Sequence, residues 1–187
     1  MEGRINRSLF ISGAMSLLLG GLSLTSVKVE RTLIRPPGAI DEAMFLSTCL
    51  RCGKCAQVCT RKAIIMGRGD KGLSIGSPYI EPRQAACDLC MDCITVCTSG
   101  ALRSVERSKV RMGLADINRD QCLAWQGHEC KACYTGCPFY NQAIKLEGHK
   151  LPVVDRKLCV GCGICENVCI ADPAAIIVTA EKGVGSL

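Results

Sequence analysis

The stretch Cys49-Leu-Arg-Cys52-Gly-Lys-Cys55-Ala-Gln-Val-Cys59 decides the fold of this protein. Its cysteines follow the spacing C-x2-C-x2-C-x3-C, which is typical of loops that hold [4Fe–4S] clusters. The two-residue gaps wrap a tight loop around one side of a cubane and direct three thiolates inward. The fourth thiolate, on the short helix that follows, is directed toward a neighbouring cluster. This segment therefore predicts a protein built around pairs of iron–sulfur clusters.

The spacing recurs along the chain with a regular period. The first cysteines of successive groups lie 38, 35 and 37 residues apart, and such a period indicates a repeated structural unit. The third group is a variant, because seven residues separate its first two cysteines. The expected cluster ligands are Cys49, Cys52, Cys55 and Cys59 (group 49–59); Cys87, Cys90, Cys93 and Cys97 (group 87–97); Cys122, Cys130, Cys133 and Cys137 (group 122–137); and Cys159, Cys162, Cys165 and Cys169 (group 159–169). These sixteen are all the cysteines of the chain and match four fully ligated [4Fe–4S] clusters.

Three other uses of the cysteines fit the pattern less well. Zinc ribbons pair C-x2-C motifs across longer stretches and do not normally add a third and fourth cysteine. A disulfide scaffold joins cysteines pairwise, whereas this repeated close spacing favours convergence on one centre. A small redox enzyme with its own substrate site is the third alternative, but the cysteine count leaves no iron open to substrate. No catalytic residue is therefore predicted. Turnover of a substrate by the isolated chain would favour the enzyme interpretation, and a colourless protein would favour the zinc-binding interpretation.

Composition limits the function further. The chain has 187 residues, and an apolar content of 48% excludes a disordered chain. Aromatic residues make up only 4%, so the apolar core is thin and the clusters are expected to help hold the fold. The formal charge of +6 assumes neutral thiols. Four oxidised clusters with their thiolates contribute about −8, which brings the charge to roughly −2. Nucleic acid is therefore not an expected partner.

Some residues near the cysteines carry a less specific signal. Trp125 either shields the third-group cluster from water or packs in the ordinary way. His128 and His149 are interpreted as surface or neighbouring residues, because the cysteines already complete the ligand count. Four basic residues near the first group are interpreted as a solvated basic face: Arg51, Lys54, Arg61 and Lys62. The alternative is that they tune the potential of the first cluster or dock an acidic partner.

An uncharged apolar run from Leu9 to about Val27 precedes the cysteines. About 19 apolar residues are just enough to span a bilayer as a helix. Residues 1–34 are therefore expected to form a hydrophobic signal or anchor helix with its linker. An uncleaved anchor is favoured because no small-x-small cleavage site follows the run. A cleaved signal and a helix buried against a partner subunit are the alternatives.

Short strand-like segments lie between the cysteine groups. We predict a helix over 41–46, a hairpin turn over 147–150, and strands over 63–66, 77–80, 143–146, 151–154 and 175–179. The predicted fold class is α+β, with an N-terminal hydrophobic helix. Residues 35–187 form a four-cluster domain of two ferredoxin-like 2[4Fe–4S] modules related as a pseudo-repeat.

Four segments of the chain form a specific combination: Arg35-Pro36-Pro37-Gly38-Ala39, Cys49-x-Arg51-Cys52-Gly53-x-Cys55, Cys122-Leu-Ala-Trp125-x-Gly127-x-x-Cys130 and Cys159-Val-Gly161-Cys162-Gly163. On these segments, positions 35 to 178 resemble the ferredoxin-type proteins of periplasmic nitrate reduction and methylamine utilisation, the NapG/MauM family. The resemblance implies four [4Fe–4S] clusters and electron flow from a membrane quinol-oxidising partner to a periplasmic oxidoreductase.

The resemblance also implies a pairing of the groups. In related four-cluster subunits of membrane oxidoreductases, the first group pairs with the fourth and the second with the third. The implied ligand sets are Cys49/Cys52/Cys55/Cys169, Cys159/Cys162/Cys165/Cys59, Cys87/Cys90/Cys93/Cys137 and Cys122/Cys130/Cys133/Cys97. The spacing alone equally allows the first group to pair with the second and the third with the fourth.

The chain departs from the family pattern at its N-terminus. Family members usually carry a twin-arginine export signal, but Arg4-Ile5-Asn6-Arg7 has only one arginine at the paired position. We expect an electron-transfer subunit in a hetero-oligomeric respiratory complex, joined to the membrane by its N-terminal helix. The periplasmic side is favoured by the resemblance, and the cytoplasmic face is the alternative.

Overall fold

The computed structural model describes residues 33–181. The apolar run 9–27 and the helix expected there lie outside the described residues. Between residues 33 and 181, no helix has the length and apolar character needed to cross a bilayer. The described chain is a small α+β structure in which short helices alternate with short strands.

The first half of the described chain is built around one hairpin. Asp41 caps its first helix, because a carboxylate oxygen of Asp41 accepts a hydrogen bond from the Ala43 N–H at 3.1 Å. Strands β1 and β2 pair antiparallel, with Ile65 opposite Tyr79. The elements are α2 (Glu42–Thr48), α3 (Lys54–Val58), β1 (Ile64–Met66), the 3-10 helix η1 (Gly69–Ser74), β2 (Pro78–Ile80), α4 (Asp92–Thr95) and the 3-10 helix η2 (Arg107–Lys109).

The second half contains two antiparallel strand pairs. Strands β3 and β6, the first and last of this half, pair with Ala115 opposite Val178, and they are called the outer pair because they enclose the β4–β5 hairpin along the chain. The five predicted strands are confirmed by β1, β2, β4, β5 and β6, whereas β3 was not predicted. The elements are β3 (Gly113–Ile117), α5 (Ala132–Gly136), β4 (Ile144–Glu147), β5 (Leu151–Val154), α6 (Ile164–Asn167) and β6 (Ile176–Ala180).

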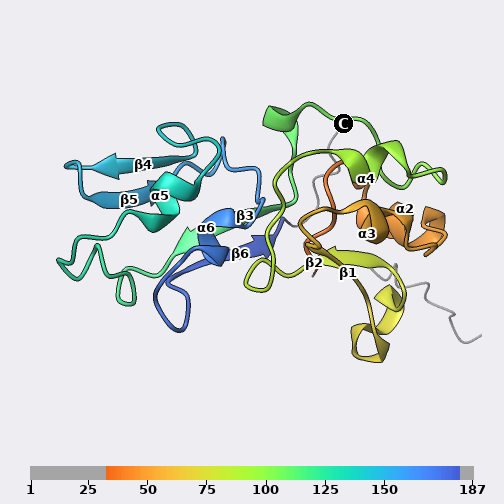
Figure 1. Ribbon diagram of the computed structural model, residues 1–187, viewed down its shortest axis with the longest axis horizontal. Coiled ribbons are helices and arrows are strands. Elements are labelled where there is room, and N and C mark those ends of the chain that lie inside the picture. The colour runs from red at the N-terminus through yellow and green to blue at the C-terminus, as the bar shows by residue number, and fades with distance from the viewer. Residues whose placement is uncertain (1–32, 182–187) are drawn as a thin grey trace, which may run out of the picture.

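The molecule is elongated, and its elements follow one another along the long axis (Figure 1). The β4–β5 hairpin and α5 lie at one end. Strands β3 and β6 with α6 lie in the middle, and α2, α3 and the η1 loop lie at the opposite end. The two halves of the chain therefore occupy successive parts of the molecule.

The outer strand pairing differs between the halves. In the second half β3 and β6 pair over five residues. In the first half the corresponding contact is a single bridge between Ala39 and Leu102, flanked by an N–H of Arg103 that donates to the Gly38 carbonyl at 2.7 Å. Both halves thus close around a hairpin, but with unequal strands, and the pseudo-repeat stays a prediction.

Cysteines form part of the apolar core. Phe45, Val110, Met112 and Ile144 are almost completely buried, and they share one continuous cluster with several cysteine side chains such as Cys93. Because the chain is poor in aromatic residues, the sulfur atoms occupy volume that larger side chains would otherwise fill. The core and the candidate metal ligands are therefore the same part of the molecule.

Candidate iron–sulfur sites

Three of the cysteine loops share an unusual backbone. In each of them the residue before the second cysteine and the residue after it adopt positive φ, which only glycine adopts without strain. A non-glycine residue there costs about 1–2 kcal/mol. These residues are Arg51 and Gly53, Leu89 and Met91, and Gly161 and Gly163. The sequence analysis did not predict this conformation, although the glycines at 53, 161 and 163 are a signal that could have indicated it.

Close packing explains one of these glycines. A Cβ on Gly161 would lie 2.3 Å from backbone atoms of Gly113 in β3. The loop that carries Cys159 and Cys162 is therefore pressed against the outer strand pair. This contact holds the fourth group at the centre of the molecule.

Short helices bring the groups together in sequential order. Helix α3 carries Cys55 and contacts α4, which carries Cys93. Helix α5 carries Cys133 and contacts α6, which carries Cys165. The first group therefore faces the second, and the third group faces the fourth.

Site A lies at the α2–α3 end of the molecule. Its hollow is lined by three cysteines of the first group and the last cysteine of the second, Cys49, Cys52, Cys55 and Cys97. The rest of its lining is largely apolar and includes Phe45, Met66, Val96 and Leu102.

Sites C and D share the second half. The site C hollow is lined by Cys122, Cys130, Cys133 and Cys169. The site D hollow is lined by Cys137, Cys159, Cys162 and Cys165. The other lining residues are apolar or glycine in both, so water is largely excluded from the space between the sulfur atoms.

Site B is defined by the neighbours of Cys93. Burial, followed by the proximity of thiols at Cys87, Cys55, Cys90 and Cys59, raises the pKa of Cys93 to about 12. Because Cys55 already belongs to site A, we assign Cys59, Cys87, Cys90 and Cys93 to site B. Within the described chain, no three His, Cys, Asp or Glu side chains are close enough to hold a single metal ion.

The arrangement of the thiols differs from the pairing that the family resemblance implies. It placed Cys169 with the first group, Cys97 with the third and Cys137 with the second, but Cys97 lines site A, Cys169 lines site C and Cys137 lines site D. It likewise placed Cys59 with the fourth group, whereas Cys59 neighbours Cys93. The physical reason is the contact of α3 with α4 and of α5 with α6, which joins groups adjacent in the chain.

Burial differs strongly among the four sites. All four cysteines of site D are buried, and sites B and C each have two buried cysteines. In site A none is buried, and Cys52 is exposed. Site D is therefore the innermost of the four and site A the outermost.

Burial also controls the protonation of the thiols. It raises the pKa of Cys87 and Cys133 to about 12 and that of Cys162 to about 11, with further contributions from neighbouring thiols. It opposes ionisation of Cys97 too, but hydrogen bonds to its sulfur from Ser99 and from the Leu102 N–H lower the Cys97 pKa overall. Donors of this kind suit a cluster, since hydrogen bonds to the ligating sulfurs tune its reduction potential.

The two halves meet at sites B and D. The N–H of Cys87 donates to the carbonyl of Cys162 at 3.0 Å, and the nearby Cys162 thiol adds to the effect of burial in raising the pKa of Cys87. A ligand loop of site B therefore contacts a ligand loop of site D directly.

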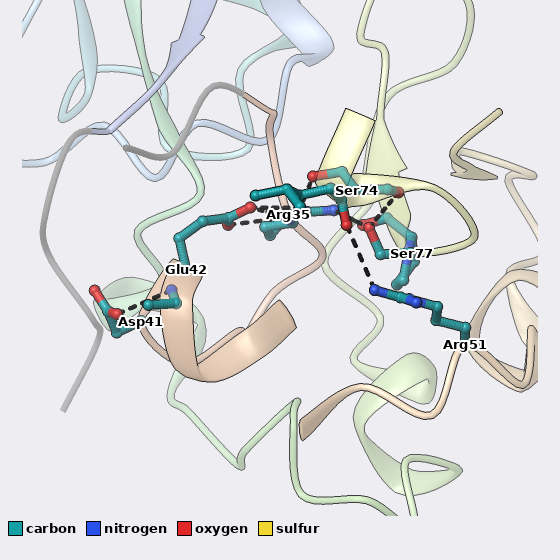
Figure 2. Close-up of polar contacts among 9 residues, drawn as sticks. Arg35, Asp41, Glu42, Arg51, Ser74 and Ser77 are labelled. Atoms are coloured by element: carbon teal, nitrogen blue, oxygen red, sulfur yellow. Dashed lines mark hydrogen bonds and ion pairs between the residues drawn. The ribbon is translucent and has the colours of Figure 1, made fainter. Parts of the chain in front are cut away.

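A buried arginine connects the elements around site A (Figure 2). Arg35 is completely buried and forms an ion pair with Glu42 of α2. Its guanidinium donates to Ser74 Oγ at 2.8 Å and to Ser77 Oγ at 2.9 Å, and it lies 4.8 Å from the centre of the Phe45 ring. Because Phe45 lines site A, this network positions part of the site wall.

Trp125 acts on site C through its wall. Its indole N–H donates to the carbonyl of Pro152 at 3.2 Å, and Pro152 lines the hollow. The Arg119 guanidinium lies 4.1 Å from the centre of the indole ring. The ring packs beside Cys122 and Ala175, which supports the packing interpretation over direct shielding.

The two histidines line the same open hollow beside site C. His128 and His149 line an open hollow that also contains Cys130 and Trp125. Sequence reasoning missed this hollow, because His149 lies in the β4–β5 turn, about twenty residues away along the chain.

Comparison with known proteins identifies the family. The ferredoxin-type protein NapG of Escherichia coli strain K12 is 40% identical over 171 residues, which cover 83% of this chain and 74% of that protein. The chain belongs to the NapG/MauM family. The methylamine utilization ferredoxin-type protein MauM of Paracoccus denitrificans is 35% identical over 185 residues, covering 89% of this chain and 83% of MauM. The ferredoxin-type protein NapF of Escherichia coli is 31% identical over 138 residues. No family model matches.

Membership of the NapG/MauM family confirms the resemblance predicted from the cysteine motifs. The sixteen cysteines and the ferredoxin-type relatives together indicate iron–sulfur clusters and electron transfer as the function of this chain. The arrangement in sites A to D agrees with that chemistry, since each set offers four thiols and the hollows of sites C and D are lined by apolar side chains and glycine.

Proposed function

We propose that sites A to D each hold one [4Fe–4S] cluster and that the chain is an electron-transfer subunit without a substrate site of its own. When bound, such a cluster accepts and releases one electron. The single observation that carries the proposal is the division of all sixteen cysteines into four sets of four. Each set has at least one neighbouring set.

The contacts among the ligands support one row of sites, in the order A, B, D, C. Cys93 of site B neighbours Cys55 of site A. Cys87 of site B is hydrogen-bonded to Cys162 of site D through the backbone. Cys165 of site D neighbours Cys133 of site C. Sites B and D thus lie between the two sites nearer the ends of the row, and apolar side chains line the hollows of sites C and D.

The partners follow from the family. We propose that the chain connects a quinol-linked membrane partner to a terminal reductase or dehydrogenase, as part of a hetero-oligomeric respiratory complex. Support comes from the relatives NapG and MauM, the latter named for methylamine utilization. The apolar run 9–27 supports association with the membrane, and we place the cluster domain on the periplasmic side.

A reductive titration tests the number of clusters. We expect the anaerobically reconstituted protein to take up about four electrons per chain, one for each [4Fe–4S] cluster, and to return them to an added oxidant. The visible absorbance of the clusters, measured during stepwise addition of dithionite, follows the uptake.

The matched variant is Cys90→Ala in site B, which should take up about three electrons, because one cluster loses a ligand. If the row order is right, the variant also isolates site A, so that its reduced EPR signal loses the broadening caused by a neighbouring paramagnetic centre. Uptake of two electrons or fewer by the unaltered protein, or a colourless zinc-loaded protein, would contradict the proposal.

Protease treatment of intact spheroplasts tests the location. If the cluster domain is periplasmic, external protease should digest it before lysis, as seen with antibodies against both ends of the chain. A cytoplasmic control protein must survive the same treatment. Protection of the cluster domain until lysis would place it in the cytoplasm and remove the periplasmic part of the proposal.

A further inference from the structure

Site A is the most accessible of the four sites. Cys52 is exposed, and the other three ligands of site A are half-buried, in contrast to the four buried ligands of site D. Electron transfer between proteins requires the two centres to approach closely, so the outermost site is the natural point of exchange. The surface around Cys52 therefore decides which partner can approach.

This surface is strongly basic. Between Glu42 and Asp70 the chain contains no acidic residue. The basic residues of this segment are all exposed: Arg51, Lys54, Arg61, Lys62 and Arg68. Arg51 and Lys54 also line the hollow of site A, so positive charge lies directly at its mouth.

Apolar side chains are exposed beside these charges. Leu50 is 69% exposed and lines site A, and Leu73 of the η1 loop is 73% exposed. The Arg51 side chain joins the two segments, because its guanidinium donates to the Leu73 carbonyl at 3.4 Å (Figure 2). Ile75 and Met44 are further exposed apolar residues of this end. An apolar centre with a charged rim is the usual composition of a protein interface.

The opposite end of the molecule has no such charge asymmetry. Beside Cys130 of site C lies an open hollow of about 810 Å³. Its charged lining is mixed, with Glu129, Lys131, Glu147 and Lys150. The two ends of the row of sites therefore present different surfaces to their partners.

We propose that a basic face docks a redox protein whose own centre is surrounded by acidic side chains. The face consists of Leu50, Arg51 and Lys54 at the mouth of site A, Leu73 joined to Arg51, and the exposed Arg61 and Lys62 that follow in the same segment. This inference rests on the proposed electron-transfer function. The complex exchanges one electron, so that the centre on one side is oxidised as the centre on the other is reduced. Opposite charges steer the partner toward site A, and the exposed leucines pack against it.

A membrane with anionic lipids is the other surface that would attract these side chains. The position of the face at the mouth of site A favours the protein partner, because lipids offer no centre that exchanges an electron. Binding to anionic vesicles is therefore included as an outcome of the test.

The test uses charge reversal in the loaded protein. The triple variant K54E/R61E/K62E leaves Arg51 and its bond to Leu73 intact, and K131E/K150E at the site C end is the matched control. The probe is a small acidic [2Fe–2S] ferredoxin, reduced beforehand and mixed with the oxidised protein in a stopped-flow instrument. We expect the triple variant to lower the second-order rate constant about 10-fold or more at low salt, and to abolish the decrease of the rate with ionic strength. The control should change the rate by less than about threefold.

Reduction by dithionite separates the two proposals. If dithionite reduces all proteins equally and the triple variant reacts with the ferredoxin as fast as the unaltered protein, the docking face is refuted while the electron-transfer function stands. If dithionite reduces none of them, the function itself fails. Loss of binding to vesicles with anionic phospholipid, together with an unchanged ferredoxin rate, would assign the face to the membrane and overturn the proposal.

Discussion

Combining Cys52→Ala with Cys97→Ala is expected to remove no more iron than either substitution alone, about four atoms per chain, because both side chains line site A. Combining Cys97→Ala with Cys130→Ala should remove about eight, because Cys130 lines site C. Iron and acid-labile sulfide per chain, measured after anaerobic purification, report the result.

The crosswise pairing of the groups makes the opposite prediction. In that pairing Cys97 and Cys130 would hold the same cluster, so the Cys97→Ala/Cys130→Ala variant would lose about four iron atoms per chain. The Cys52→Ala/Cys97→Ala variant would lose about eight. The two double variants remove the same number of cysteines and so control for each other. Equal losses in both would contradict either pairing and indicate a cluster site that is not confined to one set of four.

Replacing Arg35 with alanine is expected to lower the free energy of unfolding by about 3–5 kcal/mol, because the Glu42 carboxylate would stay buried without its ion-pair partner. Ser74, Ser77 and the carbonyl of Pro78 would also lose their donor. Because Phe45 and Pro78 line site A, its cluster should be released first, before the other three. Chemical unfolding of the loaded protein, followed by cluster absorbance and far-ultraviolet circular dichroism, measures both effects.

The matched control is Lys109→Ala. Lys109 pairs with Glu106 at 3.4 Å, but both side chains are largely exposed to solvent, so the loss of this pair should leave the free energy of unfolding almost unchanged. The loss in the free energy of unfolding caused by Arg35→Lys should lie between the losses caused by Arg35→Ala and by Lys109→Ala. Lysine keeps the positive charge but cannot reach all the acceptors of the planar guanidinium. A change below about 1 kcal/mol in Arg35→Ala would show that the network contributes little to stability.

Much of the site was predictable from local sequence. The spacing of the cysteines predicted which thiols would lie close together in one loop, and these thiols line the hollows. The turn at 147–150 and five of the six strands were also predicted, since alternation and turn residues are local signals. Strand β3 was missed because its partner β6 lies some sixty residues later, and nothing nearby marks the pairing.

The sequence by itself determined the family, the candidate cysteine ligands and the cysteine-rich loops, because these depend on residue types and short spacings. Only the tertiary structure decided which group completes which site and that sites B and D join the halves. The fourth cysteine of each group lies outside the site formed by the first three cysteines of that group. The site that it lines instead depends on which helices pack together. The contacts of α3 with α4 and of α5 with α6 send Cys97 to site A and Cys169 to site C. Such packing is a property of distant surfaces, which the spacing within one loop does not encode.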